Sequence, residues 1–481
     1  MTFDELLALV SSPDAPGLCL DSRLVKAGDI FVAVKGTVHN GCDFIDQAVA
    51  NGAKYIVCQK RYTQYAIRNT QYEIIVVENS AKAAAILAQA GNGNPASQLT
   101  NLAVTGTNGK TTVAYLVRSV IENAGEKCGL ISTITYDTAA ESCPATLTTP
   151  DCITIAEKQR QMLTAGAKYM VIEASSHALS QNRLAGIKFK AAGFTNLAGD
   201  HLDYHKTEEN YLAAKTKLFS SLSPDAVAVL NKQSPQAKQI AGKTDSKILW
   251  YAIDEPADIT ARIESTDITG TVFVLEYAGR NVKVASPLLG LYNISNHLAA
   301  AGLCLTAGFD LQTIAAGLSA LKNIPGRLEK IDWDGDFSVL VDYAHTDDAL
   351  KNVLATLRPL CKGRLIVVFG CGGDRDRTKR PRMAKVAEGR ADFVIVTSDN
   401  PRTENPGDII NEIVAGFTAN KKNVKVEPNR AKAIELAIKT AAKDDIVLIA
   451  GKGHETYQIV GTQKFDFNDK EIAQKYLAKI K

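Results

Sequence analysis

The residues with the clearest chemistry form a glycine-rich stretch, TGTNGKTT, at residues 105–112. It follows an apolar run typical of a strand and opens a helical pattern, which is the setting of a phosphate-binding loop. Glycines let backbone N–H groups approach an anion, and the N-terminus of a helix favours negative charge. The motif departs from the usual pattern at Val104, where a glycine is usual. The alternative, a plain glycine-rich turn with a surface lysine, would explain the turn but not the sequence GKTT. We predict that ATP is bound by Gly106, Thr107, Asn108, Gly109, Lys110, Thr111 and Thr112.

A second polar segment follows the apolar run YMVIE, which ends at Glu173. Ser175, His177, Gln181 and Arg183 come directly after it. A carboxylate at the end of a strand, in the same domain as a phosphate loop, is well placed to hold Mg²⁺. We therefore expect Glu173 to be a metal ligand.

A third segment, DHLDYH at residues 200–205, ends another apolar run. Taken alone, the segment could be a solvated loop, and a lone histidine is more often structural than a ligand. Beside a phosphate loop and Glu173, a Mg²⁺ role for one of its histidines is favoured. Zinc is disfavoured, since no third Cys or His follows at ligand spacing.

The elements that must position these residues are indicated by alternating apolar and helical patterns. The N-terminal runs at 29–34, 53–58 and 72–78, with a helix from Ser80 to about Ala90, predict a small α/β domain. Later runs alternate with helices, including a long helical pattern from Asn293 to about Leu321, and predict parallel sheets. Ligands of such sheets bind at the carboxyl ends of the strands.

Length and composition agree with several soluble domains. The 481 residues suggest roughly three domains. A loop-like segment at 91–100 and the turn signal NIPGR at 323–327 predict domains at 1–98, 99–327 and 328–481. The 55 basic and 52 acidic residues leave a net charge of +3, so we expect no nucleic-acid partner.

Membrane insertion and disulfides are not expected. No uncharged apolar stretch reaches about 18 residues, and the first residues are acidic, so we expect a cytoplasmic protein. The nine cysteines contain no C-x-x-C pair, which argues against a disulfide framework or a zinc site.

In their order along the chain, these motifs resemble the Mur ligase superfamily, the ATP-dependent amide ligases of peptidoglycan precursor synthesis. TGTNGKTT, EASSH at 173–177 and NLAGDHLDYH at 196–205 are similar to the signatures of its central domain. Four further similar segments are YLAAKTKLF at 211–219, LYNISNHLAAA at 291–301, IPGRLE at 324–329 and VDYAHT at 341–346.

The resemblance implies an α/β fold of three domains. The first would be a small α/β domain that binds UDP-N-acetylmuramic acid (UDP-MurNAc), and the second a phosphate-loop ATPase domain with a mostly parallel sheet. The third would be a Rossmann-like domain that binds an amino acid. In this family ATP converts a carboxylate to an acyl phosphate, and an amine then attacks to give an amide, ADP and phosphate.

The catalytic residues implied by the resemblance are Lys110, Glu173, His201 and Lys215. Thr111, Glu173 and His201 would hold Mg²⁺ or orient its waters. Lys215 matches a lysine that the family carbamylates, and a carbamate can bind a second Mg²⁺ because it is an anion. An unmodified lysine on an exposed helix face stays an alternative. Further contacts to the nucleotide are implied for Asn293, Asn296, Arg327, Asp342 and His345.

The N-terminal segment is similar to the uridine-nucleotide domain of the tripeptide-forming branch of the family, although Asn40 replaces its usual Asp. The implied substrate is UDP-MurNAc-L-Ala-D-Glu. Its implied contacts are Leu20, Ser22, Thr37, Val38, His39, Thr148, Thr149, Ser175, Gln181 and Arg183. Arg183 suits a ligand that carries carboxylates and a diphosphate.

The tetrapeptide DNPR at 399–402 resembles the form found in members that add meso-2,6-diaminopimelate, whereas lysine-adding members lack the arginine. An arginine can grip the distal carboxylate of diaminopimelate with two hydrogen bonds, and lysine has no such group. In isolation DNPR is equally consistent with an ordinary turn. The implied contacts are Arg375, Asp399, Asn400, Pro401, Arg402, Gly451 and Glu455.

The expected partners are thus small molecules, with Mg²⁺ as cofactor and the chain acting as a monomer. Three alternatives remain: the L-lysine-adding ligase, another ligase of the superfamily such as the dipeptide-adding ligase or folylpolyglutamate synthetase, and a regulator or transport ATPase with the same loop. Binding of a uridine nucleotide and amine-dependent release of ADP would distinguish them.

Overall fold

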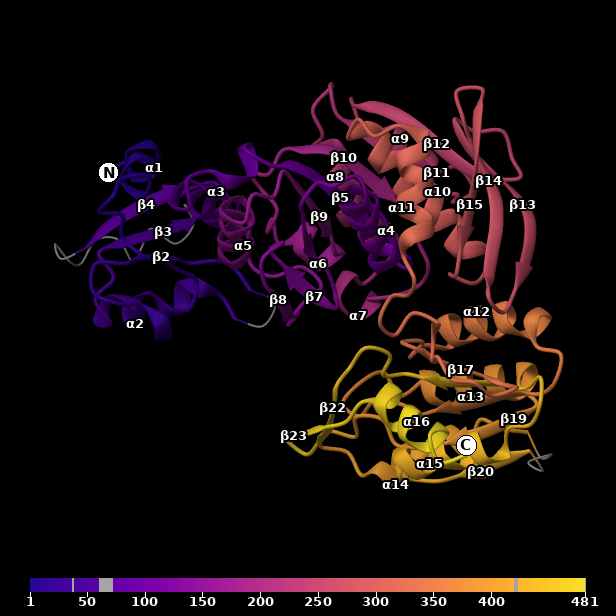
Figure 1. Ribbon diagram of the computed structural model, residues 1–481. Coiled ribbons are helices and arrows are strands. Elements are labelled where there is room, and N and C mark those ends of the chain that lie inside the picture. The colour runs from indigo at the N-terminus through magenta and orange to yellow at the C-terminus, as the bar shows by residue number, and fades with distance from the viewer. Residues whose placement is uncertain (37–38, 60–71, 419–422, 481) are drawn as a thin grey trace. The chain divides into compact units, whose positions relative to one another are not determined.

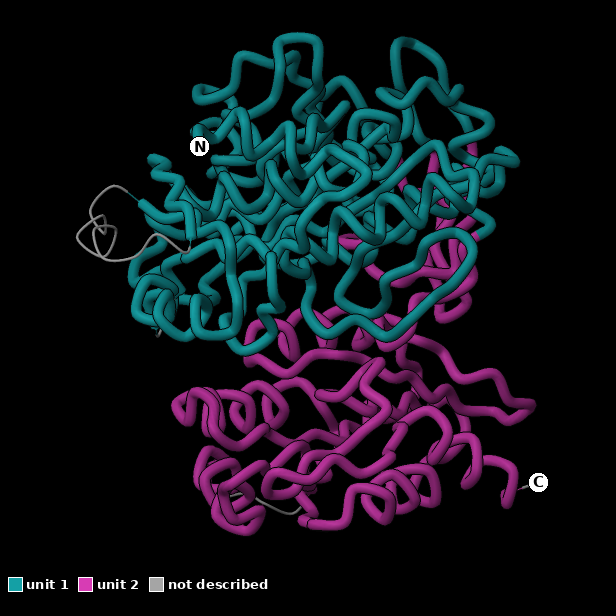
Figure 2. The backbone as a smooth tube through the Cα atoms, turned by 90° about the vertical axis from the view of Figure 1, so that its left-hand side faces the viewer, with its two compact units in different colours: residues 1–261, 275–282, 295–320 teal, residues 262–274, 283–294, 321–481 magenta. Residues whose placement is uncertain are grey.

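The computed structural model describes residues 1–36, 39–59, 72–418 and 423–480, whose strands form four sheets (Figure 1). The chain divides into two compact units (Figure 2). Unit 1 contains residues 1–261, 275–282 and 295–320, and unit 2 contains residues 262–274, 283–294 and 321–481. In the described residues, no helix has both the length and the apolar character needed to cross a membrane.

The N-terminal sheet has the order β1-β2-β3-β4, and its neighbouring strands are all parallel. Its elements are α1 (Phe3–Val10), β1 (Leu18–Cys19), β2 (Ile30–Val32), α2 (Ile45–Ala50), β3 (Tyr55–Gln59), β4 (Glu73–Val77) and α3 (Ser80–Gly91). Helix α1 begins at a capping box of Thr2 and Glu5, and α3 begins where the Asn79 side chain accepts from the N–H of Lys82. The three predicted strands and the predicted helix are confirmed.

The large sheet has the order β15-β14-β13-β12-β11-β10-β5-β9-β6-β7-β8. Its strands are β5 (Thr100–Thr105), β6 (Cys128–Ile131), β7 (Thr135–Asp137), β8 (Ser142–Pro144), β9 (Tyr169–Glu173), β10 (Phe189–Phe194), β11 (Val227–Asn231), β12 (Lys247–Ile253), β13 (Ile259–Asp267), β14 (Gly270–Tyr277) and β15 (Arg280–Ser286). From β12 to β6 the neighbours are parallel, as predicted, and β7 and β8 are antiparallel. Strand β5 therefore lies between β9 and β10, with the phosphate loop at its carboxyl end.

The helices of this part of the chain are α4 (Lys110–Asn123), α5 (Cys152–Thr164), α6 (Ser176–Ser180), α7 (Leu202–His205), α8 (Glu208–Ser220), α9 (Ala237–Ala241), α10 (Leu291–Thr306) and α11 (Leu311–Ala320). The long helix predicted from Asn293 to Leu321 is wrong, because two helices occupy this segment. Gly308 breaks it with a φ of 97°, and the Asp310 carboxylate then accepts from the N–H of Thr313 at 2.9 Å.

The C-terminal sheet has the order β16-β17-β21-β18-β19-β20, and β17, β21, β18, β19 and β20 are parallel. Its elements are β16 (Glu329–Lys330), β17 (Ser338–Asp342), α12 (Asp347–Leu357), β18 (Leu365–Phe369), α13 (Lys379–Arg390), β19 (Phe393–Val396), α14 (Pro406–Val414), β20 (Val424–Val426), α15 (Arg430–Thr440), β21 (Ile446–Ala450) and α16 (Asp469–Leu477). A hairpin of β22 (Tyr457–Val460) and β23 (Gln463–Asp466) precedes α16.

Helices cover both faces of this sheet. One face packs against buried side chains of α12, α13 and α14, and the other against those of α15 and α16. The three layers confirm the predicted Rossmann-like fold, and with the other two sheets they confirm the predicted α/β class. The domain boundaries at 98 and 327 stay predictions.

Candidate active site

The phosphate loop joins β5 to α4 through a backbone that needs glycine. Gly109 caps α4 with a φ of 88°, and a Cβ there would collide with the Asn296 side chain. The Lys110 Nζ folds back over the loop and donates to the carbonyls of Gly106 at 2.9 Å and Thr107 at 2.8 Å. The loop thus has the backbone and the ammonium group that bind phosphates.

Residues after β10 hold the loop from the other side. The Asn196 Oδ1 accepts from the N–H of Asn108 at 3.0 Å, and the Thr195 hydroxyl donates to the carbonyl of Asn108 at 2.6 Å. The Thr107 hydroxyl lies 3.1 Å from that of Tyr211. The sequence analysis missed Thr195 and Asn196 as site residues, although their position after an apolar strand is the signal that could have found them.

Lys215 lies directly against this loop. It is 1% exposed, so the alternative of an exposed lysine is wrong. Its Nζ donates to the carbonyl of Gly106 at 2.8 Å and lies 4.4 Å from the centre of the Tyr211 ring. Burial, with the positive charge of Lys110, holds the pKa of Lys215 well below its usual value of 10.5. A larger fraction of this amine is neutral, and the neutral form is the nucleophile that reacts with CO₂.

Glu173 ends β9, the strand beside β5, so it lies at the same carboxyl ends of the strands as the loop. Its side chain is fully buried and accepts from the N–H of Thr133 at 2.8 Å and from its hydroxyl at 3.1 Å. In the described part of the chain no cation is paired with this carboxylate. A buried carboxylate without a cation fits a metal ion, and Mg²⁺ is commonly held by one carboxylate, a hydroxyl and phosphates. The sequence analysis missed Thr133, for which a single threonine gives no signal.

His201 belongs to a group of aromatic rings behind the loop. It has a φ of 54°, its N–H donates to Asp200 at 2.8 Å, and its ring centre lies 4.9 Å from that of His177. The His205 Nε2 lies 2.9 Å from the Ser176 hydroxyl. Burial lowers the pKa values of His201 and His205, and that of His177 to about 4. Among residues that the structure describes, no three or more His, Cys, Asp or Glu side chains are arranged to hold a metal ion by themselves.

The predicted dipeptide contacts come together after β9. The Thr149 hydroxyl donates to the carbonyl of Glu173 at 2.6 Å and accepts from the N–H of Ser175 at 3.0 Å. Arg183 donates to the carbonyl of Thr149 at 2.6 Å and to the side chain of Gln181 at 2.6 Å and 3.0 Å. Thr148 is connected to this group through Thr133. The Oγ1 atoms of Thr148 and Thr133 lie 3.1 Å apart, and Thr133 contacts the Glu173 carboxylate.

The predicted uridine contacts lie apart from this group, in the N-terminal sheet region. The Ser22 hydroxyl donates to Gln47 at 2.7 Å, and the His39 ring packs edge-on against Phe44 at 5.9 Å. Leu20 is partly buried, and Thr37 and Val38 lie outside the described residues. In the described ranges no hydrogen bond joins Ser22 or His39 to Thr149 or Arg183.

In unit 2, three predicted nucleotide contacts gather at the carboxyl end of β17. The Asp342 carboxylate accepts from the N–H groups of Leu328 at 2.7 Å and Ala344 at 2.8 Å, and burial raises its pKa. The Arg327 guanidinium lies 4.9 Å from the centre of the Tyr343 ring, and the His345 Nδ1 lies 2.8 Å from the Tyr343 carbonyl. Asn293, also in unit 2, donates to the carbonyl of Leu289. Asn296, in unit 1, lies against Gly109.

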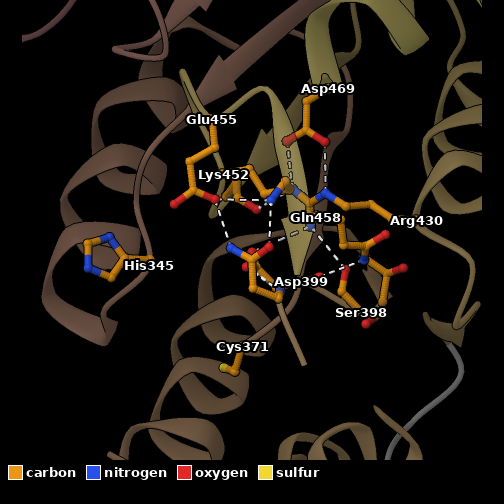
Figure 3. Close-up of polar contacts among 12 residues, drawn as sticks. His345, Cys371, Ser398, Asp399, Arg430, Lys452, Glu455, Gln458 and Asp469 are labelled. Atoms are coloured by element: carbon orange, nitrogen blue, oxygen red, sulfur yellow. Dashed lines mark hydrogen bonds and ion pairs between the residues drawn. The ribbon is translucent and has the colours of Figure 1, made fainter. Parts of the chain in front are cut away.

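The loops after β19 and β21 meet in unit 2 and bring predicted amino-acid contacts together (Figure 3). The Asn400 Nδ2 donates to the Glu455 carboxylate at 2.8 Å, and Gly451 lies against the carboxylate of Asp399. The pKa of Asp399 is lowered by the cations Arg430 and Lys452, which outweigh the effect of burial.

The remaining two predicted arginines lie in different loops: Arg402 follows β19, and Arg375 follows β18. Arg402 donates from Nη1 to the carbonyl of Gly373 at 2.8 Å, which fixes one edge of its guanidinium. Pro401, next to it, is buried. Arg375 is exposed, and its Nη1 donates to the carbonyl of Asp374 at 3.0 Å. The structure therefore connects Arg402 to the cluster of the neighbouring loops and leaves Arg375 on the surface.

The fold and the site define a multidomain α/β protein with a phosphate-binding loop at the carboxyl end of an inner strand of a mostly parallel sheet. Three family models match it: "Mur ligase family, catalytic domain" at residues 16–92, "Mur ligase middle domain" at 104–304 and "Mur ligase, glutamate ligase domain" at 326–453. The chain belongs to the Mur ligase family.

Curated relatives are similar over nearly the whole chain. The UDP-N-acetylmuramoyl-L-alanyl-D-glutamate–2,6-diaminopimelate ligase of Bacillus licheniformis is 42% identical over 475 residues, 98% of this chain and 96% of the relative. The protein of the same name from Gloeobacter violaceus is 43% identical over 472 residues, 97% of this chain and 94% of the relative.

Solved structures of Mur ligases are also similar to this chain. A structure of a protein with that name is 33% identical with a TM-score of 0.70, and the match covers 100% of this chain and 99% of that one. The MurF ligase of Thermotoga maritima, solved in complex with ADP, shares the fold with a TM-score of 0.63 at 20% identity, covering 98% of this chain and 99% of that one.

Proposed function

We propose that this chain is an ATP-dependent ligase of peptidoglycan precursor synthesis that joins meso-2,6-diaminopimelate to UDP-MurNAc-L-Ala-D-Glu. Its relatives at 42% and 43% identity carry the name of the 2,6-diaminopimelate ligase. The observation that carries the choice of amine is the pairing of opposite charges around the loops after β19 and β21. Arg402 and the carboxylates of Asp399 and Glu455 complement a group that bears both an ammonium and a carboxylate.

Diaminopimelate has such a group at its distal end. The Nη1 of Arg402 is engaged by Gly373, and its Nη2 and Nε have no hydrogen bond within the described residues. Those two donors match the two oxygens of a carboxylate. Lysine has only the ammonium at this end, so it would leave the arginine without its partner.

The ATP half of the reaction is assigned to unit 1. In the proposed reaction a carboxylate of the D-glutamate attacks the γ-phosphorus of ATP, ADP leaves, and an acyl phosphate forms. The amine of the amino acid then attacks the acyl carbon and phosphate leaves. Lys110 and the loop N–H groups bind the phosphates and stabilise the charge that develops on them. Thr149, Ser175, Gln181 and Arg183 orient the dipeptide.

Thr111 and Glu173 would hold Mg²⁺, with His201 orienting its waters, and the ion would lessen the repulsion between the phosphates and the attacking carboxylate. Lys215 is proposed to react with CO₂, which would place a carbamate anion against the loop. Asn293, Asn296, Arg327, Asp342 and His345 stay predictions as nucleotide contacts. Monomeric state and cytoplasmic location likewise stay predictions.

The deciding experiment measures ADP release and product mass with UDP-MurNAc-L-Ala-D-Glu and either meso-diaminopimelate or L-lysine. We expect turnover with diaminopimelate and little with lysine. Efficient use of lysine with no use of diaminopimelate would overturn the assignment and favour the lysine-adding ligase.

Replacing the guanidinium tests the same assignment in one residue. Arg402→Ala should raise the KM for diaminopimelate about 10- to 100-fold, because this factor corresponds to the free energy of a lost charge-assisted hydrogen bond. The KM for ATP should stay unchanged. Arg390→Ala, an exposed arginine at the end of α13, is the matched control and should change neither constant. An unchanged KM in Arg402→Ala would remove Arg402 from the site.

A further inference from the structure

A buried lysine links the two loops that surround the proposed distal end of diaminopimelate (Figure 3). The Lys452 side chain is 0% exposed. Its Nζ donates to the Glu455 Oε2 at 3.0 Å, in the loop after β21, and to the Asn400 Oδ1 at 3.1 Å, in the loop after β19. A lysine is almost never fully buried unless it is paired, so the site retains this group against a desolvation cost.

The hydrogen bonds fix the orientation of Asn400. Its Oδ1 also accepts from the N–H of Ile459 at 3.0 Å, so two donors identify this atom as the oxygen. The Nδ2 must then point the other way, and it donates to the Glu455 Oε2 at 2.8 Å. Lys452, Asn400 and Glu455 therefore form a closed ring of hydrogen bonds, in which each side chain contacts the other two.

This ring leaves one oxygen of Glu455 available. The Oε2 accepts from both Lys452 and Asn400, whereas the Oε1 has no hydrogen bond within the described residues. The Glu455 side chain is 16% exposed. With its Oε2 held by two donors, the carboxylate cannot rotate without breaking both hydrogen bonds, and the direction of the Oε1 is set before any ligand arrives.

A second buried cation, Arg430, holds the backbone next to Gly451. The side chain of Arg430 is fully buried and donates to both oxygens of Asp469 at 2.7 Å. It also donates to the carbonyl of Ala450 at 3.0 Å, directly before Gly451. Arg430 is thus paired with Asp469 and lies 3.9 Å from Asp399, whereas Lys452 is paired with Glu455 at 3.0 Å.

We propose that Lys452 is a positioning residue for amine recognition. It holds Glu455 and Asn400 so that the Glu455 Oε1 meets the distal ammonium of diaminopimelate. This inference rests on the proposed function, because it assumes that the loops bind that amino acid.

The test compares two amines that differ only in the distal ammonium. L-2-aminopimelate keeps the reacting amine and the distal carboxylate of diaminopimelate but lacks the second amine. For each enzyme the ratio of kcat/KM for diaminopimelate to kcat/KM for 2-aminopimelate is measured, together with the KM for ATP. The variant is Lys452→Met, which keeps the length of the side chain and removes its charge. The control is Lys439→Met, an exposed lysine that pairs with Glu435 on α15.

We expect the wild type and Lys439→Met to prefer diaminopimelate, and Lys452→Met to lose at least tenfold of that preference at an unchanged KM for ATP. The substitution should change kcat/KM for 2-aminopimelate little, because this amino acid has no distal ammonium to contact Glu455. An equal loss with both amines, or an unchanged ratio, would show a merely structural role and overturn the proposal.

A folding defect is detected by thermal unfolding of the variant. If Lys452→Met does not fold, Lys452→Gln, which keeps a hydrogen-bond donor without the charge, is measured in the same way. If neither folds, Lys452 serves the fold and the proposal fails. If the wild type does not use diaminopimelate at all, the proposed function fails first, and this outcome is distinct from an unchanged ratio in an active variant.

Discussion

Lys215 and His454 are two residues whose surroundings strongly lower the pKa of the side chain. Lys215 is buried beside a second cation, and His454 is partly buried near Arg327 and His345. In both cases burial opposes the charged form, and a nearby positive charge adds to the effect. Each residue therefore carries a prediction about its protonation that a single substitution can test.

For Lys215 we expect carbamylation in the presence of bicarbonate. Its pKa lies well below the usual 10.5, so the neutral amine is more abundant near neutral pH than in an exposed lysine. With ¹³C-bicarbonate, the wild type should show a carbamate resonance in its ¹³C spectrum that is absent from Lys215→Arg, and this variant should lose at least about 100-fold of the ligase activity. Lys217→Arg, two positions along α8, is the control. The same resonance in Lys215→Arg would contradict the assignment.

For His454 we expect a loss of stability on acidification. Burial, with Arg327 and His345, lowers its pKa from 6.5 to about 4, and its Nδ1 is buried without a hydrogen-bond partner in the described residues. The unfolded chain binds a proton as the pH falls below 6.5, while the folded chain does so only near 4, so acidification favours unfolding within this window. The free energy of unfolding should fall between pH 7 and pH 4, and it should fall by about 1–3 kcal/mol less in His454→Gln than in the wild type. Urea unfolding at each pH measures this difference. Parallel pH profiles for the two proteins would show that His454 does not contribute.

At the scale of elements, α13 and α14 hold the loops after β18 and β19 together through one buried arginine. The Arg380 side chain is 0% exposed, and its guanidinium donates to both oxygens of Glu404 at 2.8 Å and 2.9 Å and to Glu412 at 2.8 Å. Glu404 also accepts from the N–H of Asp374 at 2.6 Å. Because Glu404 follows Arg402 by two residues, this network fixes the loop that carries the proposed carboxylate contact.

Arg380→Met should therefore destabilise unit 2 by about 1–3 kcal/mol, less than for a fully buried pair because both glutamates are partly exposed. It should also raise the KM for diaminopimelate. Arg382→Met is the matched control, since Arg382 lies on the same helix, is 49% exposed and pairs with Asp347 at 3.0 Å. That change should cost less than about 1 kcal/mol. Urea unfolding measures both, and equal losses would argue against a special role for Arg380.

The sequence predicted these elements where apolar runs end in polar or glycine-rich turns, as at β5, β9, β19 and β21. Each run is long and buried, so its signal is strong. The strand β13 was not predicted, because it is exposed over most of its length and offers no apolar run. Thr133, Lys452 and Arg380 were missed as site residues because their roles depend on partners 40, 52 and 24 positions away in the sequence.

At the scale of the whole molecule, anionic ligands must be met by local groups, because the net charge is only +3. The candidate groups include Lys110 and Arg183 in unit 1 and Arg402 in unit 2. A weak overall field gives little long-range steering, so raising the salt concentration from about 50 to 200 mM should change kcat/KM for ATP only a few-fold.

The hydrophobic core is also divided. Five clusters of buried apolar side chains each fall within one unit: three lie in unit 1 and two in unit 2. Units with cores of their own unfold separately unless they are strongly coupled, so a single free energy of unfolding does not describe such a chain. We expect at least two transitions by scanning calorimetry.

Substitutions of buried residues in each unit identify the transitions. Leu116→Ala removes a side chain that is 0% exposed on α4 in unit 1 and should lower one transition by several degrees, since such a change costs about 2–5 kcal/mol. Arg380→Met should lower a different transition, because Arg380 and both of its partners lie in unit 2. An ATP analogue that binds the loop of unit 1 should raise the transition that Leu116→Ala lowers. A single transition that both variants lower equally would mean that the two units unfold as one.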